Sequence, residues 1–146
     1  MVDFGFGAHT PVGGFDIFRA VFAPTGEMTA SFSYGGALND RAFGLAARSG
    51  GTVALAGFHN GGIDFGRGTP FGGSDNDAFV AKLTGQNQHL WSHSFEAEGQ
   101  QRGKAVAMDD QGAVIVTGSF EGALDLGGDV LSSAGARDVF IARFAP

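Results

Sequence analysis

Two histidines, His89 and His93, stand four positions apart, and on a helix this spacing would place both imidazoles on one face, where they could bind zinc. On a strand, four residues span roughly 13 Å, which is too far for both side chains to bind one ion. His93 would then share a strand face with Trp91 and Phe95. The sequence therefore favours a packing role for His93, and we predict no metal site and no cofactor.

Acidic residues gather in two short segments, Asp75-Asn76-Asp77 and Asp109-Asp110. Clustered carboxylates suggest calcium, but neither segment has the alternating oxygen ligands, the glycine and the distal glutamate of an EF-hand-like loop. Because Asp77 recurs elsewhere in the chain, we interpret it as structural, with a carboxylate that accepts hydrogen bonds from loop amides. Weak calcium binding by these oxygen-rich loops is the alternative.

Trp91 and Tyr34 have the side chains that a lectin would use to stack on a sugar ring. Aromatic residues in apolar strands belong to the core far more often than to a binding site. The two residues also do not match in the repeat described below, whereas repeated lectin sites would match. Core packing is therefore the preferred interpretation, and the ligand-binding residues, if there are any, stay unknown.

No catalytic signature accompanies these residues. No serine stands in Gly-x-Ser-x-Gly, and Gly66-Arg67-Gly68 lacks the third glycine and the helix of a dinucleotide site. A carboxylate pair for glycoside hydrolysis is a spatial feature that the sequence does not reveal. An enzyme would need a polar cluster confined to one copy of the repeat, and His59, Asp64 and Arg48 are the residues to inspect for it. We expect no catalytic residue and no enzymatic activity.

Charge and composition exclude several classes of partner. The net charge is −6 and the nine Lys and Arg residues are scattered, which argues against nucleic acid and against an anionic membrane surface. No apolar stretch reaches the roughly 18–20 residues of a spanning helix, so we expect no membrane insertion. Cysteine is absent, which excludes disulfides and thiolate metal sites. The segment Met1–Gly5 has neither a basic nor an apolar region, so we expect no signal peptide in this chain.

The elements that hold these residues are predicted by a repeat of 61 residues. Glycine contributes 26 residues and phenylalanine 15, which indicates many short strands, frequent turns and aromatic packing. Arg41 matches Arg102 and Gly61 matches Gly122 at the same offset. We interpret the recurring aspartates and glycines as structural positions of the repeat; they are Asp3, Asp64 and Asp125, then Asp16, Asp77 and Asp138, and the pair Gly57 and Gly118.

Each period contains four strand-like runs, which in the clearest copies are Asp77–Leu83, Leu90–Phe95, Lys104–Met108 and Ala113–Phe120. Asp, Asn and Gly at 84–87 and 109–112 predict hairpin turns. The consecutive apolar residues Ala113–Val116 predict a strand covered on both faces. Small residues at Val53–Gly57 favour an innermost strand, and Leu124–Arg137 is expected to form a loop or an extra hairpin. Helical periodicity is not sustained anywhere in the sequence.

The motifs Asp77–Lys82, Leu90–Phe95, Gly103–Asp109 and Gly112–Phe120 resemble the bacterial SBBP repeats, which are named for the seven-bladed β-propeller. The resemblance covers nearly the whole chain, although Ala30 stands where the second copy has Trp91. It implies a secreted or surface-exposed bacterial protein with an extracytoplasmic location, and it implies no particular activity.

Taken together, the sequence predicts an all-β, propeller-like array of four-stranded antiparallel blades, with about nine strands and without closure in a single chain. We expect a partial blade over residues 1–35, a full blade over 36–96 and a partial blade over 97–146. Exposed blade faces predict a partner, either further copies of the same repeat or self-association of this chain. The expected function is a non-catalytic scaffold or protein-interaction module, and the alternative is a lectin-like, glycan-binding propeller.

Overall fold

The computed structural model of this chain describes residues 1–3, 5–73 and 75–146, so Phe4 of the first Asp-Phe-Gly motif lies outside the described residues. Across these ranges the fold is all-β, with antiparallel sheets and no helix. The fold class is therefore confirmed at this level. None of the described segments forms a helix that could cross a membrane.

Nine of the described strands have six or more residues, as expected from four runs per period. They are β3 (Ile17–Phe22), β4 (Met28–Tyr34), β5 (Arg41–Ala47), β6 (Val53–His59), β7 (Asp77–Leu83), β8 (His89–Phe95), β9 (Gln101–Met108), β10 (Val114–Phe120) and β13 (Asp138–Phe144). Four further strands of two residues form small hairpins; they are β1 (Val2–Asp3), β2 (Ala8–His9), β11 (Ala123–Leu124) and β12 (Leu131–Ser132). The pair β11–β12 shows that the Leu124–Arg137 link contains an extra hairpin.

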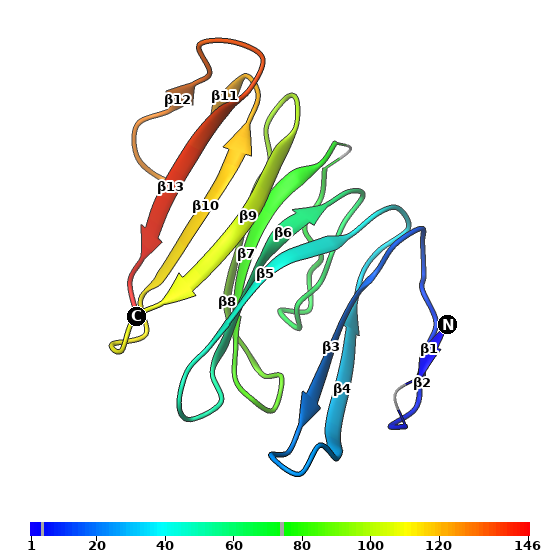
Figure 1. Ribbon diagram of the computed structural model, residues 1–146. Helices are drawn as coiled ribbons and strands as arrows, with labels where there is room; N and C mark the ends of the chain where they lie inside the picture. Colours follow the sequence, from blue (N-terminus) through cyan, green and yellow to red (C-terminus); the bar gives the residue numbers. More distant parts are fainter. Residues whose placement is uncertain (4, 74) are drawn as a thin grey trace.

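The long strands form three sheets that follow one another along the chain (Figure 1). The first sheet is β3–β4, the middle sheet has the order β5-β6-β7-β8, and the third sheet has the order β13-β10-β9. The turns between paired strands have the predicted chemistry, since Gly112 and Asn87 adopt positive φ values of 92° and 69°. Their counterparts Gly51 and Gly26, 61 residues earlier, do the same at 85° and 86°.

The repeat extends to irregularities of the strand pairing. In the middle sheet the register between β5 and β6 shifts between Ala42 and Gly44, which leaves Phe43 as a bulge. In the third sheet Lys104, the counterpart of Phe43, is skipped in the same way between β9 and β10. Equal bulges at equal positions indicate that both sheets are built to one backbone plan.

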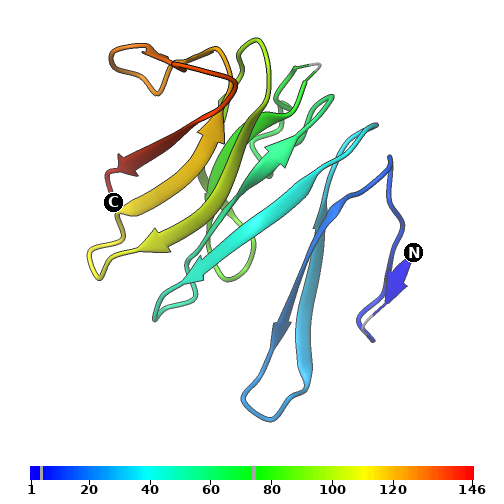
Figure 2. The ribbon, with the colours of Figure 1, turned by 45° about the horizontal axis from the view of Figure 1, so that its top comes forward.

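The three sheets lie face to face, so that the middle sheet is covered on both sides (Figure 2). Its forward face, which packs on the third sheet, consists of Ala54, Ala56, Ala78 and Val80 with Phe95 at its edge. Its rear face, which packs on the first sheet, consists of Val53, Leu55, Phe79, Ala81 and Leu83. All seven residues of β6 and all seven of β7 are buried, because both sides of these strands meet another layer.

Two sequence-based expectations about individual strands are wrong. The run Ala113–Val116 was expected to be covered on both faces, but Ile115 is 38% exposed, because only one side of the third sheet meets another described layer. The small residues of β6 were expected to mark an innermost strand. Instead β6 lies between β5 and β7, and β5 occupies the edge of the sheet.

Candidate functional site

The first set of repeated aspartates forms tight local turns. Asp3, Asp64 and Asp125 each accept a hydrogen bond through Oδ1 from the amide two residues further on, at 2.7, 2.9 and 2.7 Å. The donors are in each case glycines, which readily adopt the positive φ of such turns. These carboxylates therefore have backbone partners at all three positions.

The second set of repeated aspartates stands at the start of equivalent strands. Asp16 and Asp138 accept hydrogen bonds from the amides of Val12 and Ala134, four residues earlier, at 2.7 and 2.6 Å. Asp77 instead accepts a hydrogen bond from the amide of Ala97, and its Oδ2 is buried without a partner among the described residues, as Oδ1 of Asp16 also is. Burial, with the nearby charges of Glu96 and Asp75, raises the pKa of the Asp77 carboxyl to about 6.

Asp77 lies in an acidic recess of about 240 Å³, which is also lined by Asp75, Glu96 and Glu98. The described residues nevertheless contain no group of three His, Asp or Glu side chains arranged to hold a metal ion. Within this recess, burial and the neighbouring carboxylates favour the protonated form of the Asp77 carboxyl.

A serine and a histidine lie together in the middle sheet. His59 Nε2 is 2.7 Å from Ser94 Oγ, and His59 stands opposite Asp77 in the β6–β7 register. Activation of a serine would also require a carboxylate on Nδ1, but that atom has no partner among the described residues. The imidazole is completely buried, it stacks on Phe71, and burial lowers its pKa to about 4. The imidazole of His59 is therefore packed inside the sheet in its neutral form, while Ser94 is half-buried.

The three polar residues singled out for an enzyme do not meet. His59 lies at the end of β6, while Arg48 lies in the turn before β6 and donates a hydrogen bond to the backbone oxygen of Asp110 in the third sheet. Asp64 accepts hydrogen bonds from the amides of Gly66 and Arg67. These contacts give each of the three residues a local structural partner.

The aromatic and histidine candidates belong to the packing between sheets. The ring of His93 lies 5.5 Å from Trp91 and 6.4 Å from Phe95, so the predicted shared strand face is confirmed. Trp91 packs against the core between the middle and third sheets, whereas Tyr34 belongs to the core between the first and middle sheets. His89 lies within hydrogen-bond distance of Ser92, at 2.9 Å.

At Gly57 and Gly118 the backbone of the preceding strand, β5 or β9, lies close to the glycine. A Cβ at Gly57 would lie 1.9 Å from the carbonyl oxygen of Arg41, and at Gly118 it would lie 2.2 Å from that of Arg102. No side chain fits at those distances, so these glycines are required by the bulge that both sheets share.

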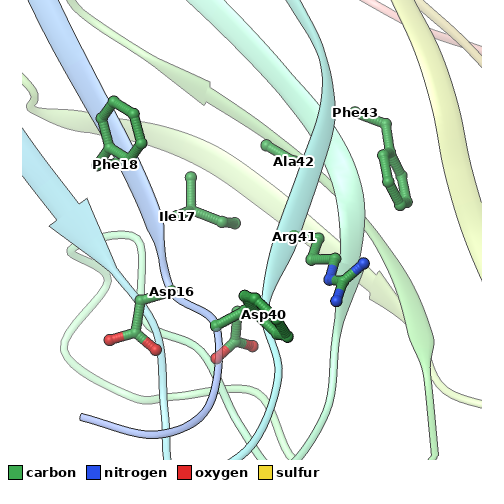
Figure 3. A pocket seen from close by; sticks show the side chains of 8 residues that line it. Asp16, Ile17, Phe18, Asp40, Arg41, Ala42 and Phe43 are labelled. Atoms are coloured by element: carbon green, nitrogen blue, oxygen red, sulfur yellow. The ribbon is translucent and has the colours of Figure 1, made fainter. Parts of the chain in front are cut away.

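One cleft of the structure was not predicted from the sequence. It measures about 710 Å³ and lies between β3 and β5, with Ile17 and Phe18 on one wall and Ala42 and Phe43 on the other (Figure 3). Asp16 and Asp40 carry carboxyls at one end of it. Asp40 is 1% exposed, and burial raises its pKa to about 6, although the amides of Gly36 and Asn60 donate to it. A signal was present in the repeat, since Asp40 and its fully buried counterpart Gln101 are both polar.

No protein-family model matches this chain, and a search of curated proteins found no match to it.

Proposed function

We propose that this chain is a non-catalytic scaffold or interaction module, in which each sheet is a blade of a propeller-like array of SBBP-type repeats, as in secreted or surface-exposed bacterial proteins. Its partner is a further copy of the same repeat, either in another chain or by self-association. The proposal rests on one observation. Exposed apolar residues on the two outer sheets occupy the same repeat positions as residues that are buried between sheets.

The forward face of the third sheet carries the main part of this observation. Val139 and Ile141 are each 73% exposed, whereas their counterparts Ala78 and Val80 in the middle sheet are 0% exposed beneath the third sheet. Ile115 adds to the same face, as the counterpart of the buried Ala54. Clustered exposed apolar side chains of this kind are typical of an interaction surface.

The rear face of the first sheet shows the complementary case. Phe22 is 54% exposed, while its counterpart Leu83 is 0% exposed in the core between the first and middle sheets. The third sheet thus exposes a forward face at one end of the stack, and the first sheet exposes a rear face at the other end. Forward and rear faces already pack on each other twice within this chain.

The glycan-binding alternative has no comparable support. Trp91 and Tyr34 lie in different cores, on opposite sides of the middle sheet, so they form no common platform for a sugar. For the catalytic alternative, the histidine beside Ser94 has no carboxylate on Nδ1 among the described residues.

The proposal is tested by light scattering of the purified chain over a range of concentrations. We expect the wild type to self-associate and the double variant Val139→Thr/Ile141→Thr to be dispersed, because threonine keeps the strand preference while reducing apolar surface. Leu90→Thr is the matched control. Leu90 is 48% exposed but lies on β8, and its counterpart is Thr29. A monomeric wild type, or equal dispersal by Leu90→Thr, would contradict the proposal.

A further inference from the structure

Strand β3 has an open edge at a position that is filled in the other two sheets. The counterparts of β3 are β7 and β13, and each pairs along seven residues with the strand that precedes it in the repeat, β6 for β7 and β10 for β13. β3 pairs only with β4 in the described chain. The backbone groups along the other edge of β3 are therefore of the kind that accepts an added strand.

The cleft of about 710 Å³ lies beside this edge, between β3 and β5 (Figure 3). The equivalent space one repeat later lies between β7 and β9, and it is occupied by β6 of the middle sheet. There Gly103 of β9 approaches the backbone of Gly57 so closely that an added Cβ would lie 3.0 Å from its amide nitrogen. The cleft thus lies where the strand next to β3 would stand.

A backbone hydrogen bond beside the cleft has an equivalent between the middle and third sheets. The amide of Asp40 donates a hydrogen bond to the carbonyl oxygen of Phe15 at 2.6 Å. At the equivalent positions the amide of Gln101 donates to the carbonyl oxygen of Asn76 at 2.7 Å. The first sheet is therefore attached to the middle sheet by the same backbone contact that attaches the middle sheet to the third.

We propose that the open edge of β3 binds a β-hairpin of this same repeat, of the sequence type found in β9–β10, which completes the first sheet as two added strands. Backbone hydrogen bonds to β3 supply the affinity, and small residues such as Gly103 and Gly118 supply the fit where strands crowd. The inference rests on the proposed function, and it specifies which segment of a repeat copy docks at this edge.

The repeat also fixes the register of the complex. Val116 pairs with Ala142 and Val114 pairs with Phe144 in the third sheet. The counterparts of Ala142 and Phe144 in β3 are Ala20 and Phe22. An added hairpin would therefore place Val116 opposite Ala20 and Val114 opposite Phe22.

Disulfide cross-linking tests this register, because the chain contains no cysteine of its own. The probe is a synthetic peptide of residues 101–120 that carries Val116→Cys or Val114→Cys. It is mixed with the full chain carrying Ala20→Cys or Phe22→Cys. Directly opposed residues have Cβ atoms roughly 4.5–5.5 Å apart, whereas diagonal neighbours are about 7–8 Å apart, too far for a disulfide.

We expect cross-links for the two matched pairs, Ala20 with Val116 and Phe22 with Val114, and loss of cross-linking for the two exchanged pairs. Equal cross-linking in all four combinations, or none in the matched pairs, would overturn the inference. As a second measurement, the wild-type peptide should slow hydrogen exchange of β3 amides, and unchanged exchange would count against binding at this edge.

The result is separable from the test of the proposed function. The variant Val139→Thr/Ile141→Thr alters the face of the third sheet and leaves the edge of β3 intact, so it should still cross-link to the peptide in register. If the chain proves monomeric while the matched pairs cross-link, the face-to-face proposal fails and the edge site stands. If the chain associates without cross-linking, only the edge site fails.

Discussion

At the scale of single residues, the middle sheet buries two titratable groups side by side. His59 and Asp77 are opposite each other in the β6–β7 register, and both are at most 1% exposed. Burial disfavours the charged form of each group, so the pKa of the imidazole falls to about 4 and that of the carboxyl rises to about 6. The third sheet has Phe120 in place of His59, so this histidine is not required by the repeat itself.

His59 should make the chain less stable as the pH falls. Between about pH 6.5 and 4 the imidazole of the unfolded chain takes up a proton, while that of the folded chain stays neutral. We expect the free energy of unfolding to contain a term that is lost over this range, on the order of 2–3 kcal/mol. His59→Phe should remove the term. Urea unfolding at several pH values, followed through the single tryptophan, Trp91, measures it.

The two buried aspartates provide the internal check on this measurement. The raised pKa values of Asp40 and Asp77 favour the folded state when these groups are protonated, so their contribution is lost as pH rises from about 4 to 6. This slope has the opposite sign and is common to the wild type and to His59→Phe, so it cancels in the difference between them. Parallel pH curves for the two proteins would contradict the prediction.

At the scale of elements, the bulge in β5–β6 and in β9–β10 brings backbone against backbone. Phe43 and Lys104 occupy the bulged positions, and Lys104 Nζ lies 4.6 Å from the centre of the Phe43 ring. Two bulges in neighbouring sheets thus also contact each other. The glycines opposite them, Gly57 and Gly118, let the two strands keep their pairing beside the extra residue.

Gly118→Ala should therefore destabilise the fold. Its Cβ would lie 2.2 Å from the Arg102 carbonyl oxygen and 2.5 Å from the Phe140 ring, so the β9–β10 pairing must shift. We expect a loss of about 1–3 kcal/mol in the free energy of unfolding, the usual cost of overpacking a core. Gly128→Ala is the control, because nothing lies within 4 Å of a Cβ there. Equal stability of the two variants in urea titrations would refute this reason for the glycine.

The strands and turns could be predicted from the sequence because their signals are local. Alternating or continuous apolar runs, and Asp, Asn and Gly at the turns, specify β7, β8, β9 and β10 to within three residues at either end. The exposure of Ile115 could not be predicted in this way, because its apolar run looks the same whether or not another layer covers it. The place of β6 in its sheet is likewise decided by pairing between distant segments.

At the scale of the whole molecule, burial is concentrated in the middle layer. β7 is buried throughout, while its counterpart β3 in the first sheet contains exposed residues on the side away from the middle sheet. Lys82 extends from β7 to the carbonyl oxygen of Gly112 in the third sheet, at 2.6 Å, and Arg19 extends from β3 to Asn87 in the middle sheet, at 3.0 Å. Stability should therefore decrease from the centre of the stack toward its ends.

Hydrogen exchange should show this gradient directly. We expect the amides of β7 to exchange at least about tenfold more slowly than those of β3, because opening β7 requires two layers to separate. The comparison is matched, since the two strands are copies of one another in the repeat. Uniform protection of all three sheets in an exchange experiment monitored by nuclear magnetic resonance would contradict the layered picture.

The cleft between β3 and β5 depends on how two sheets are placed relative to each other, which explains why the sequence did not predict it. Its walls come from strands that do not pair, and its acidic end joins Asp16 to Asp40 from different segments. The repeat assigns each residue a place within one sheet, but it does not say which sheet edges stay open. The signal in the sequence was that Asp40 and Gln101, which occupy the same repeat position, are both polar, and both are buried in the structure.

The two outer faces of the stack are different surfaces, since the forward face exposes Ile115, Val139 and Ile141 and the rear face exposes Phe22. A twofold dimer would press two identical surfaces together, whereas both contacts between sheets inside this chain join a forward face to a rear face. Molecules that associate through a forward face and a rear face are all oriented in the same direction, in a heterologous, head-to-tail arrangement. Such growth ends only when the accumulated rotation brings the last subunit back to the first, and otherwise it continues as a fibre.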